Sequence, residues 1–280
     1  MKRGWLAIVV VLLGACGPAT SPTPGGSPSA EPPSATAAPS SPAAASATAA
    51  PSASATAEPG TGLAVDSLVE VLVTDLVVRS HPGIDPPSTI LADRLTAPDR
   101  AFVVDGPVEA AGYEWHLVAP LMRADSSRGP FGWIARASRE GEEWVRGVSA
   151  PCPAEPVDLA GVLALQPLER LACFGNDSLT LTAPVITCGA GGGPWTFDPS
   201  WLVNVGGCGL ALDATAENVL VYRVPPGGSD PGSGPATVTG HFDDAAAAGC
   251  TVTSADPAAY PAPSAEEAVV MCRTEFVLGS

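Results

Sequence analysis

Seven cysteines are the residues of this chain with the clearest chemistry, and they fall into two groups. Cys16 stands alone near the N-terminus, in a stretch without other reactive side chains. An even number of cysteines confined to one region is typical of a disulfide framework. The remaining six all lie beyond residue 150: Cys152, Cys173, Cys188, Cys208, Cys250 and Cys272.

A metal site is the competing interpretation of these six cysteines. Zinc sites use closely spaced pairs such as C-x₂-C, or cysteines mixed with histidines. Here the closest two cysteines are 15 positions apart, and His241 is the one histidine nearby. We therefore predict three disulfides and neither a metal nor a cofactor. Six cysteines allow 15 connectivities, among which we favour the pairing of neighbours, Cys152–Cys173, Cys188–Cys208 and Cys250–Cys272.

The first 15 residues have the pattern of an export signal. Lys2 and Arg3 precede nine largely apolar residues, 5–13, a run shorter than the 20 or so that span a bilayer. The following Leu13-Gly-Ala-Cys16 resembles the bacterial lipobox. That resemblance implies cleavage before Cys16, acylation of its thiol, and anchoring to the outer side of a bacterial cell membrane; an ordinary secretory signal with a free thiol is the alternative.

Residues 16–62 form a second region, composed almost entirely of Pro, Ser, Ala, Thr and Gly after the cysteine. Glu31 and Glu58 are the charged residues there, and no aromatic residue is present. Such a composition cannot bury enough apolar surface to fold. We expect a disordered tether between the lipid and the folded part of the chain.

The charge balance excludes some partners. The formal net charge is −16, and Lys2 is the sole lysine. Residues 63–149 hold 13 acidic residues against eight arginines, and residues 150–280 hold 14 against three. Nucleic acid is therefore not an expected partner, because phosphate binding needs a basic face. Electrostatic adhesion to anionic lipid is excluded for the same reason, so the predicted lipid is the expected contact with the membrane.

Residues 63–149 have the pattern of short strands separated by turns, with no amphipathic helix. Period-two alternation across 112–118 places Tyr113, Trp115 and Leu117 on one face of a strand. Five strands in so short a region favour a small barrel. The expected strands are 68–73, 76–78, 101–104, 112–118 and 132–135.

This region resembles the bacterial SH3-like domain of exported envelope proteins. The matching segments, in order, are LVVRSHPG at 76–83, IL at 90–91, AFVV at 101–104, GYEWHLV at 112–118 and GWIA at 132–135. Val77 and His81 depart from the Asn and Gly usual in that family, and the loop 118–132 is longer than its minimum. The resemblance implies binding of peptidoglycan peptides or other envelope ligands in an aromatic-lined groove.

Four residues are the candidates for that groove: Tyr113, Trp115 and Trp133 along its wall, with Arg79 at its edge. The alternative is structural, because large aromatic residues on alternating strands are commonly core residues. Arg79 could equally brace the loop that follows it.

Residues 150–280 predict a second small β-barrel or sandwich stapled by disulfides, so the fold class expected for the whole chain is all-β. A short helix is expected at 243–249, with Asp243 or Asp244 at its start. The segment VTGHFDD followed by CRTEFVL resembles the closing part of an OB-like barrel over about 45 residues. The expected strands are 168–174, 179–186, 201–205, 219–224, 236–242 and 269–278.

No catalytic motif stands out, so no catalytic residue is assigned and the chain is expected not to be an enzyme. A calcium site formed by Asn176, Asp177, Asp243 and Asp244 is a minor alternative. Three functions stay open: a surface-anchored protein binding cell-wall or envelope ligands, a structural or assembly component with protein partners, and an extracellular enzyme accessory or hydrolase.

The lipid anchor predicts the behaviour of a Cys16→Ser variant. Without the thiol there is no acceptor for the lipid, so the variant should be released into the medium or stay unprocessed. Fractionation followed by mass spectrometry of the N-terminus measures this. A variant that is processed normally and yet recovered in full with the membrane would contradict the prediction.

Overall fold

The computed structural model of this chain describes residues 63–186, 195–197, 209–212, 219–254, 257–258 and 261–279. The predicted signal peptide, Cys16, the tether, the Cys188–Cys208 pair and the strand expected at 201–205 lie outside these ranges. Within them the chain is mostly strand, as the sequence predicts, with two larger sheets and a two-stranded one.

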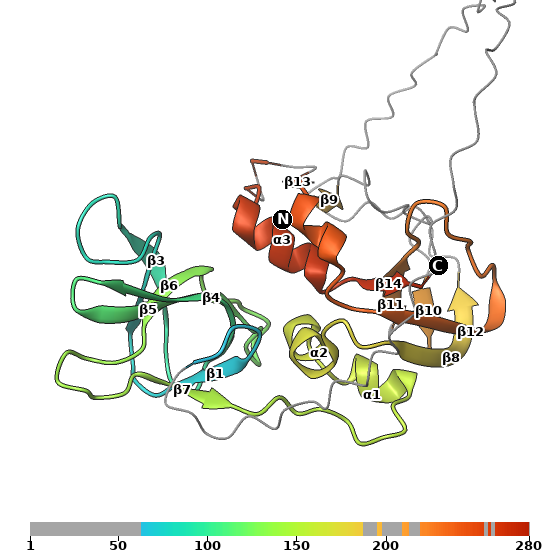
Figure 1. Ribbon diagram of the computed structural model, residues 1–280, viewed down its shortest axis with the longest axis horizontal. Helices are drawn as coiled ribbons and strands as arrows, with labels where there is room; N and C mark the ends of the chain where they lie inside the picture. The colour runs from blue at the N-terminus through green and yellow to red at the C-terminus, as the bar shows by residue number, and fades with distance from the viewer. Residues whose placement is uncertain are drawn as a thin grey trace, which may run out of the picture. The chain divides into compact units, whose positions relative to one another are not determined.

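The first sheet contains seven antiparallel strands (Figure 1, blue to green). Its spatial order is β3-β2-β6-β5-β4-β1-β7, so the sheet is built around the long β4–β5 hairpin. The bounds are β1 Leu68–Val71, β2 Leu76–Arg79, β3 Ile90–Leu95, β4 Arg100–Ala110, β5 Tyr113–Pro120, β6 Gly132–Ala135 and β7 Val145–Val148.

The second sheet is a closed five-stranded barrel in the order β10-β11-β14-β12-β8 (Figure 1, yellow to red). Its β11 and β14 are parallel and its other pairs antiparallel. The barrel strands are β8 Leu179–Ile186, β10 Gly209–Ala211, β11 Val219–Arg223, β12 Gly234–His241 and β14 Phe276–Leu278. The helices of this part are α1 Leu159–Leu163, α2 Pro167–Phe174, η1 Ala245–Gly249 and α3 Ala265–Arg273. Strands β9 Trp195–Phe197 and β13 Val252–Ser254 form the two-stranded sheet.

The five strands expected in residues 63–149 are all present, and two more join them. β3 is an edge strand with largely exposed side chains, and β7 has only one fully buried residue, Val145. Neither therefore has the apolar alternation that marks a strand in sequence. In residues 150–280 the strands expected at 179–186, 219–224 and 236–242 are confirmed.

Two expected strands are wrong. Residues 168–174 belong to helix α2, which begins at Pro167, has a capping box between Gln166 and Glu169, and ends before Gly175. Residues 269–278 are split between α3, capped by Ser264, and the short β14. In both cases start and stop signals for a helix were present, and the apolar run between them was one face of that helix.

The helix expected at 243–249 is confirmed as the short 3₁₀ helix η1. Asp244 caps it by accepting a hydrogen bond from the Ala246 amide at 2.7 Å. Two of the three expected disulfides are also present. Cys152–Cys173 ties the chain before α1 to the end of α2, and Cys250–Cys272 ties the end of η1 to α3.

Strands β1, β4 and β5 are buried on both faces. On one face, Val69, Val103 and Val118 pack in the first sheet's own core with Val78 and Ile134. On the other face, the adjacent residues Leu68, Phe102 and Ala119 pack in a second cluster. This cluster also contains residues of helices α1 and α2 and of the barrel strands. The two sheets therefore share one hydrophobic cluster.

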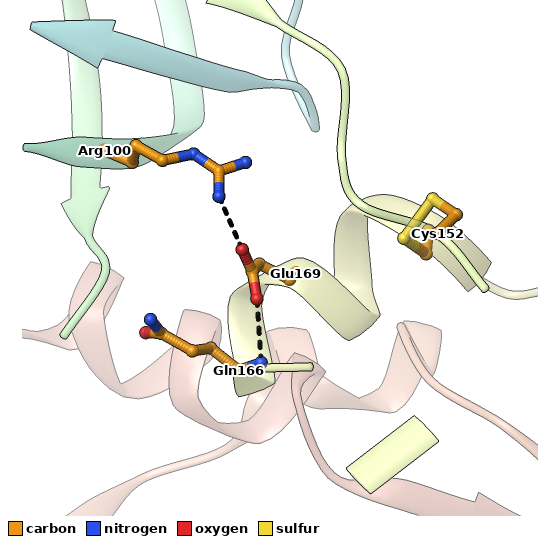
Figure 2. Close-up of a disulfide and its surroundings, with 5 residues drawn as sticks. Arg100, Cys152, Gln166 and Glu169 are labelled. Carbon is orange, nitrogen blue, oxygen red and sulfur yellow. Dashed lines mark hydrogen bonds and ion pairs between the residues drawn. A yellow bond between two sulfur atoms is a disulfide. The ribbon is translucent and has the colours of Figure 1, made fainter. Parts of the chain in front are cut away.

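Polar contacts join the same elements at the margin of this cluster. Glu169 of α2 accepts a hydrogen bond from Arg100 Nη1 of β4 at 2.7 Å and one from the Gln166 amide at 3.0 Å (Figure 2). The Gln166 side chain exchanges two hydrogen bonds with the Met122 backbone, at 2.8 and 3.1 Å. Arg273 of α3 lies 2.6 Å from an Asp66 carboxylate oxygen.

The shared cluster predicts that the two sheets unfold together. Phe102 is fully buried in it, so Phe102→Ala should lower the free energy of unfolding by about 3–5 kcal/mol. Hydrogen exchange at increasing urea, read by mass spectrometry, should show β6 and β8 losing protection together. This should hold in the wild type and in Phe102→Ala, with the shared transition at a lower urea concentration in the variant. Val221→Ala, at an exposed barrel position, is the control and should change stability by about 0.5 kcal/mol or less. Separate transitions for the two sheets would contradict the shared core.

Candidate functional site

The main candidate site is a cavity of about 420 Å³ in the first sheet. It lies between the turn that follows β1, strand β2, the loop leading to β3, and the start of β5. Its volume falls within the range of about 300–1,000 Å³ that is usual for small-molecule sites. The lining residues are Val73, Thr74, Asp75, Leu76, Val77, Arg79, Ile84, Ile90, Tyr113, Trp115, Ala135 and Trp144.

Three aromatic rings form one wall of this cavity, and Tyr113 contacts both of the others. Its ring centroid lies 5.9 Å from that of Trp115 with the planes at 64°, an edge-to-face contact. It lies 6.1 Å from Trp144 with the planes at 28°. The Arg139 guanidinium lies over the Tyr113 ring at 4.9 Å. The rings are thus held in fixed orientations by one another before any ligand arrives.

Trp115 combines both roles considered for it from the sequence. It is only 4% exposed, as expected of a core residue, and its Nε1 donates a hydrogen bond to the Ala110 carbonyl at 2.9 Å. The same side chain also lines the cavity. Trp115 therefore forms a rigid floor whose polar atom is already satisfied by the protein.

Arg79 lines the cavity and also braces the loop that follows it. Its Nη1 donates to the Ile84 and Ser88 carbonyls, both at 3.4 Å, and to Ser88 Oγ at 3.2 Å. The buried Ser88 hydroxyl in turn lies 2.7 Å from the His81 carbonyl oxygen and 2.8 Å from that of Gly83. This small network fixes the loop that carries Ile84 to the cavity.

Trp133 does not line the cavity, although its strand partner Arg79 does. Trp144 takes its place, and sequence reasoning did not assign it to the site. The hairpin that presents Trp144 is closed by the Ala137–Glu143 bridge and by the Trp144 amide donating to Arg136 at 2.9 Å. A tryptophan that follows Glu142 and Glu143 in a turn was the available signal. Its ring packs partly against the first sheet's core and also lines the cavity.

Two further hollows, of about 480 and 220 Å³, lie beside Met122. One includes Asp99 and Arg123: burial alone would raise the pKa of Asp99, but hydrogen bonds from Arg123 and the Thr96 amide outweigh it and lower this pKa below its ordinary value. The other includes Glu275, whose pKa is raised by burial despite Arg223 at 3.5 Å. The charged groups in both hollows are engaged by neighbouring side chains, and neither hollow presents a pair of free carboxylates.

Two of the four residues considered for calcium, Asp243 and Asp244, have other partners. The Asp243 carboxylate receives two hydrogen bonds from Arg273, at 2.6 and 3.1 Å, and Asp244 caps η1. Across the described ranges, no three His, Cys, Asp or Glu side chains gather as a metal site would require. Within the same ranges, no helix has the length and apolar character needed to cross a membrane.

Comparisons with known protein families, with curated proteins and with solved structures give no match to this chain. The site is therefore interpreted from its own geometry. That geometry consists of a preformed apolar cavity, three mutually fixed aromatic rings and one arginine.

The network behind Arg79 predicts the effect of Ser88→Ala. Loss of the Ser88 hydroxyl leaves the His81 and Gly83 carbonyl oxygens without their donor. The free energy of unfolding should therefore fall by about 1–3 kcal/mol. Amide exchange in residues 80–90 should rise. Ser149→Ala removes an exposed hydroxyl and should leave both quantities unchanged. Equal behaviour of the two variants would show that the network does not order the loop.

Proposed function

We propose that this chain is an exported, lipid-anchored protein that binds peptides of the bacterial cell wall in the cavity formed by Tyr113, Trp115 and Trp144. The observation that carries the proposal is this preformed cavity, which is mostly apolar and has few polar groups at its edge. Cavities of this kind orient a ligand through those few polar groups and hold it by the apolar area it buries.

The first sheet supports the proposal through the arrangement of the resembling segments. The strand with LVVR (β2), the hairpin with GYEWHLV (β5) and the strand with GWIA (β6) are adjacent in the sheet. Arg79, Tyr113 and Trp115 from these strands line one cavity. A bacterial SH3-like domain would use its strands in this way.

The barrel supports an OB-like interpretation of residues 150–280. Around the barrel the strands follow one another in the order β8-β10-β11-β14-β12, and β11 and β14 are parallel. Counted along the chain, this is the order first, second, third, fifth, fourth. An OB fold is a five-stranded Greek-key barrel. We propose that this part supports the binding domain through the shared cluster rather than carrying a second ligand site.

Anchoring is proposed from the sequence alone. The positively charged start, the short apolar run and the lipobox before Cys16 support export and acylation. The disulfides Cys152–Cys173 and Cys250–Cys272 agree with an oxidising compartment outside the cytoplasm.

Binding to peptidoglycan tests the proposal. Full-length protein in detergent should sediment with purified peptidoglycan at moderate salt. Trp144→Ala should weaken retention about tenfold or more, because it removes a large aromatic contact from the cavity. Trp133→Ala is the matched control, since that ring lies outside the cavity lining, and a folded Trp133→Ala variant should be retained like the wild type. No retention of the wild type would contradict wall binding.

A further inference from the structure

The arginines of the first sheet divide into two groups. Five of the eight between residues 63 and 149 form ion pairs: Arg100, Arg123, Arg128, Arg136 and Arg146. Arg79, Arg94 and Arg139 form none within the described part of the chain. In so acidic a protein an arginine without a carboxylate partner is unexpected. Two of these three adjoin the aromatic cavity: Arg79 lines it, and Arg139 lies over Tyr113.

Arg79 has hydrogen-bonding capacity left for a ligand. All three of its hydrogen bonds use Nη1, and their acceptors are neutral oxygens of Ile84 and Ser88. Its Nε and Nη2 donate to no group in the described ranges. A guanidinium with two N–H groups free on one edge matches the two oxygens of a carboxylate. The bonds through Nη1 meanwhile hold the side chain in place.

The rest of the lining is suited to an aliphatic group beside that carboxylate. Ile84 and Ile90 are 42% and 50% exposed, unusually high for isoleucine, and both line the cavity with Trp144. A ligand lying against them would cover apolar surface that water now contacts. Charge and apolar area are thus adjacent in one site.

One lining group opposes an anionic ligand. Asp75, in the turn after β1, carries the one carboxylate of the lining. The net charge of the whole chain is also negative, but at physiological ionic strength charges beyond about 8 Å are largely screened. Asp75 is therefore the group whose removal should matter most for an anion.

We propose that the cavity recognises a peptide by its free carboxylate, which Arg79 binds while an adjacent aliphatic side chain packs against Ile84, Ile90 and Trp144. This inference rests on the proposed function, because it names the chemical group of the cell-wall peptide that is recognised.

A matched pair of ligands tests it. The peptide fraction released from purified peptidoglycan by an amidase is measured against full-length protein in detergent, before and after carbodiimide amidation of its carboxyl groups. The free-acid form should bind about tenfold more tightly than the amidated form, as expected for a charge-assisted hydrogen-bonded pair. Arg79→Gln should abolish the difference.

Two further variants keep the test decisive if Arg79→Gln disturbs its loop. Asp75→Asn should tighten binding of the free acid and not of the amide; its backbone φ of 56° is one that Asn also tolerates. Arg146→Gln removes the same charge from an exposed pair with Glu70 and should change neither affinity. Equal binding of both ligand forms would overturn the carboxylate inference and leave the proposed function standing. Binding of neither form would overturn both.

Discussion

The burial of β1, β4 and β5 on both faces is the constraint on which the rest of this structure depends. One face of these strands closes the first sheet's own core, and Leu68, Phe102 and Ala119 on the other face complete the core of the helices and the barrel. Hydrophobic burial is the main favourable term in folding, so each half of the protein supplies part of the other half's stability. Strand β5, which carries Trp115 to the cavity, is therefore packed on both of its faces.

Glu169 shows how the polar groups at this boundary are used. Its carboxylate closes the capping box of α2 with one oxygen and holds Arg100 with the other. Its side chain is only 8% exposed. An isolated charge at such a position would be costly, whereas one with both oxygens bonded is tolerated. The Glu169 side chain therefore fixes the position of the start of α2 relative to β4.

The sequence predicts this fold best where apolar and polar residue types alternate along a strand, as in Tyr113-Glu-Trp-His116 of β5, even though the folded strand is buried on both faces from Trp115 onward. The strands around Tyr113 and Trp115 could be identified from their alternation, and neighbouring cysteines paired as expected at Cys152–Cys173 and Cys250–Cys272. Edge strand β3 was missed because most of its side chains are exposed, so its sequence lacks the apolar alternation of a half-buried strand. The cavity could be predicted only in part, since Ile84 and Trp144 reach it from a loop and a hairpin whose paths depend on tertiary hydrogen bonds such as that of Ser88.

The two disulfides also affect what a protease can achieve. They join residues 21 and 22 positions apart, and the first of these loops holds α1 and most of α2. A single cut between Cys152 and Cys173 would leave both fragments covalently attached, with α2 still packed in the shared cluster. The connection between the two halves of the protein can therefore be severed once in its backbone without the halves separating, and the damage would be visible only after reduction.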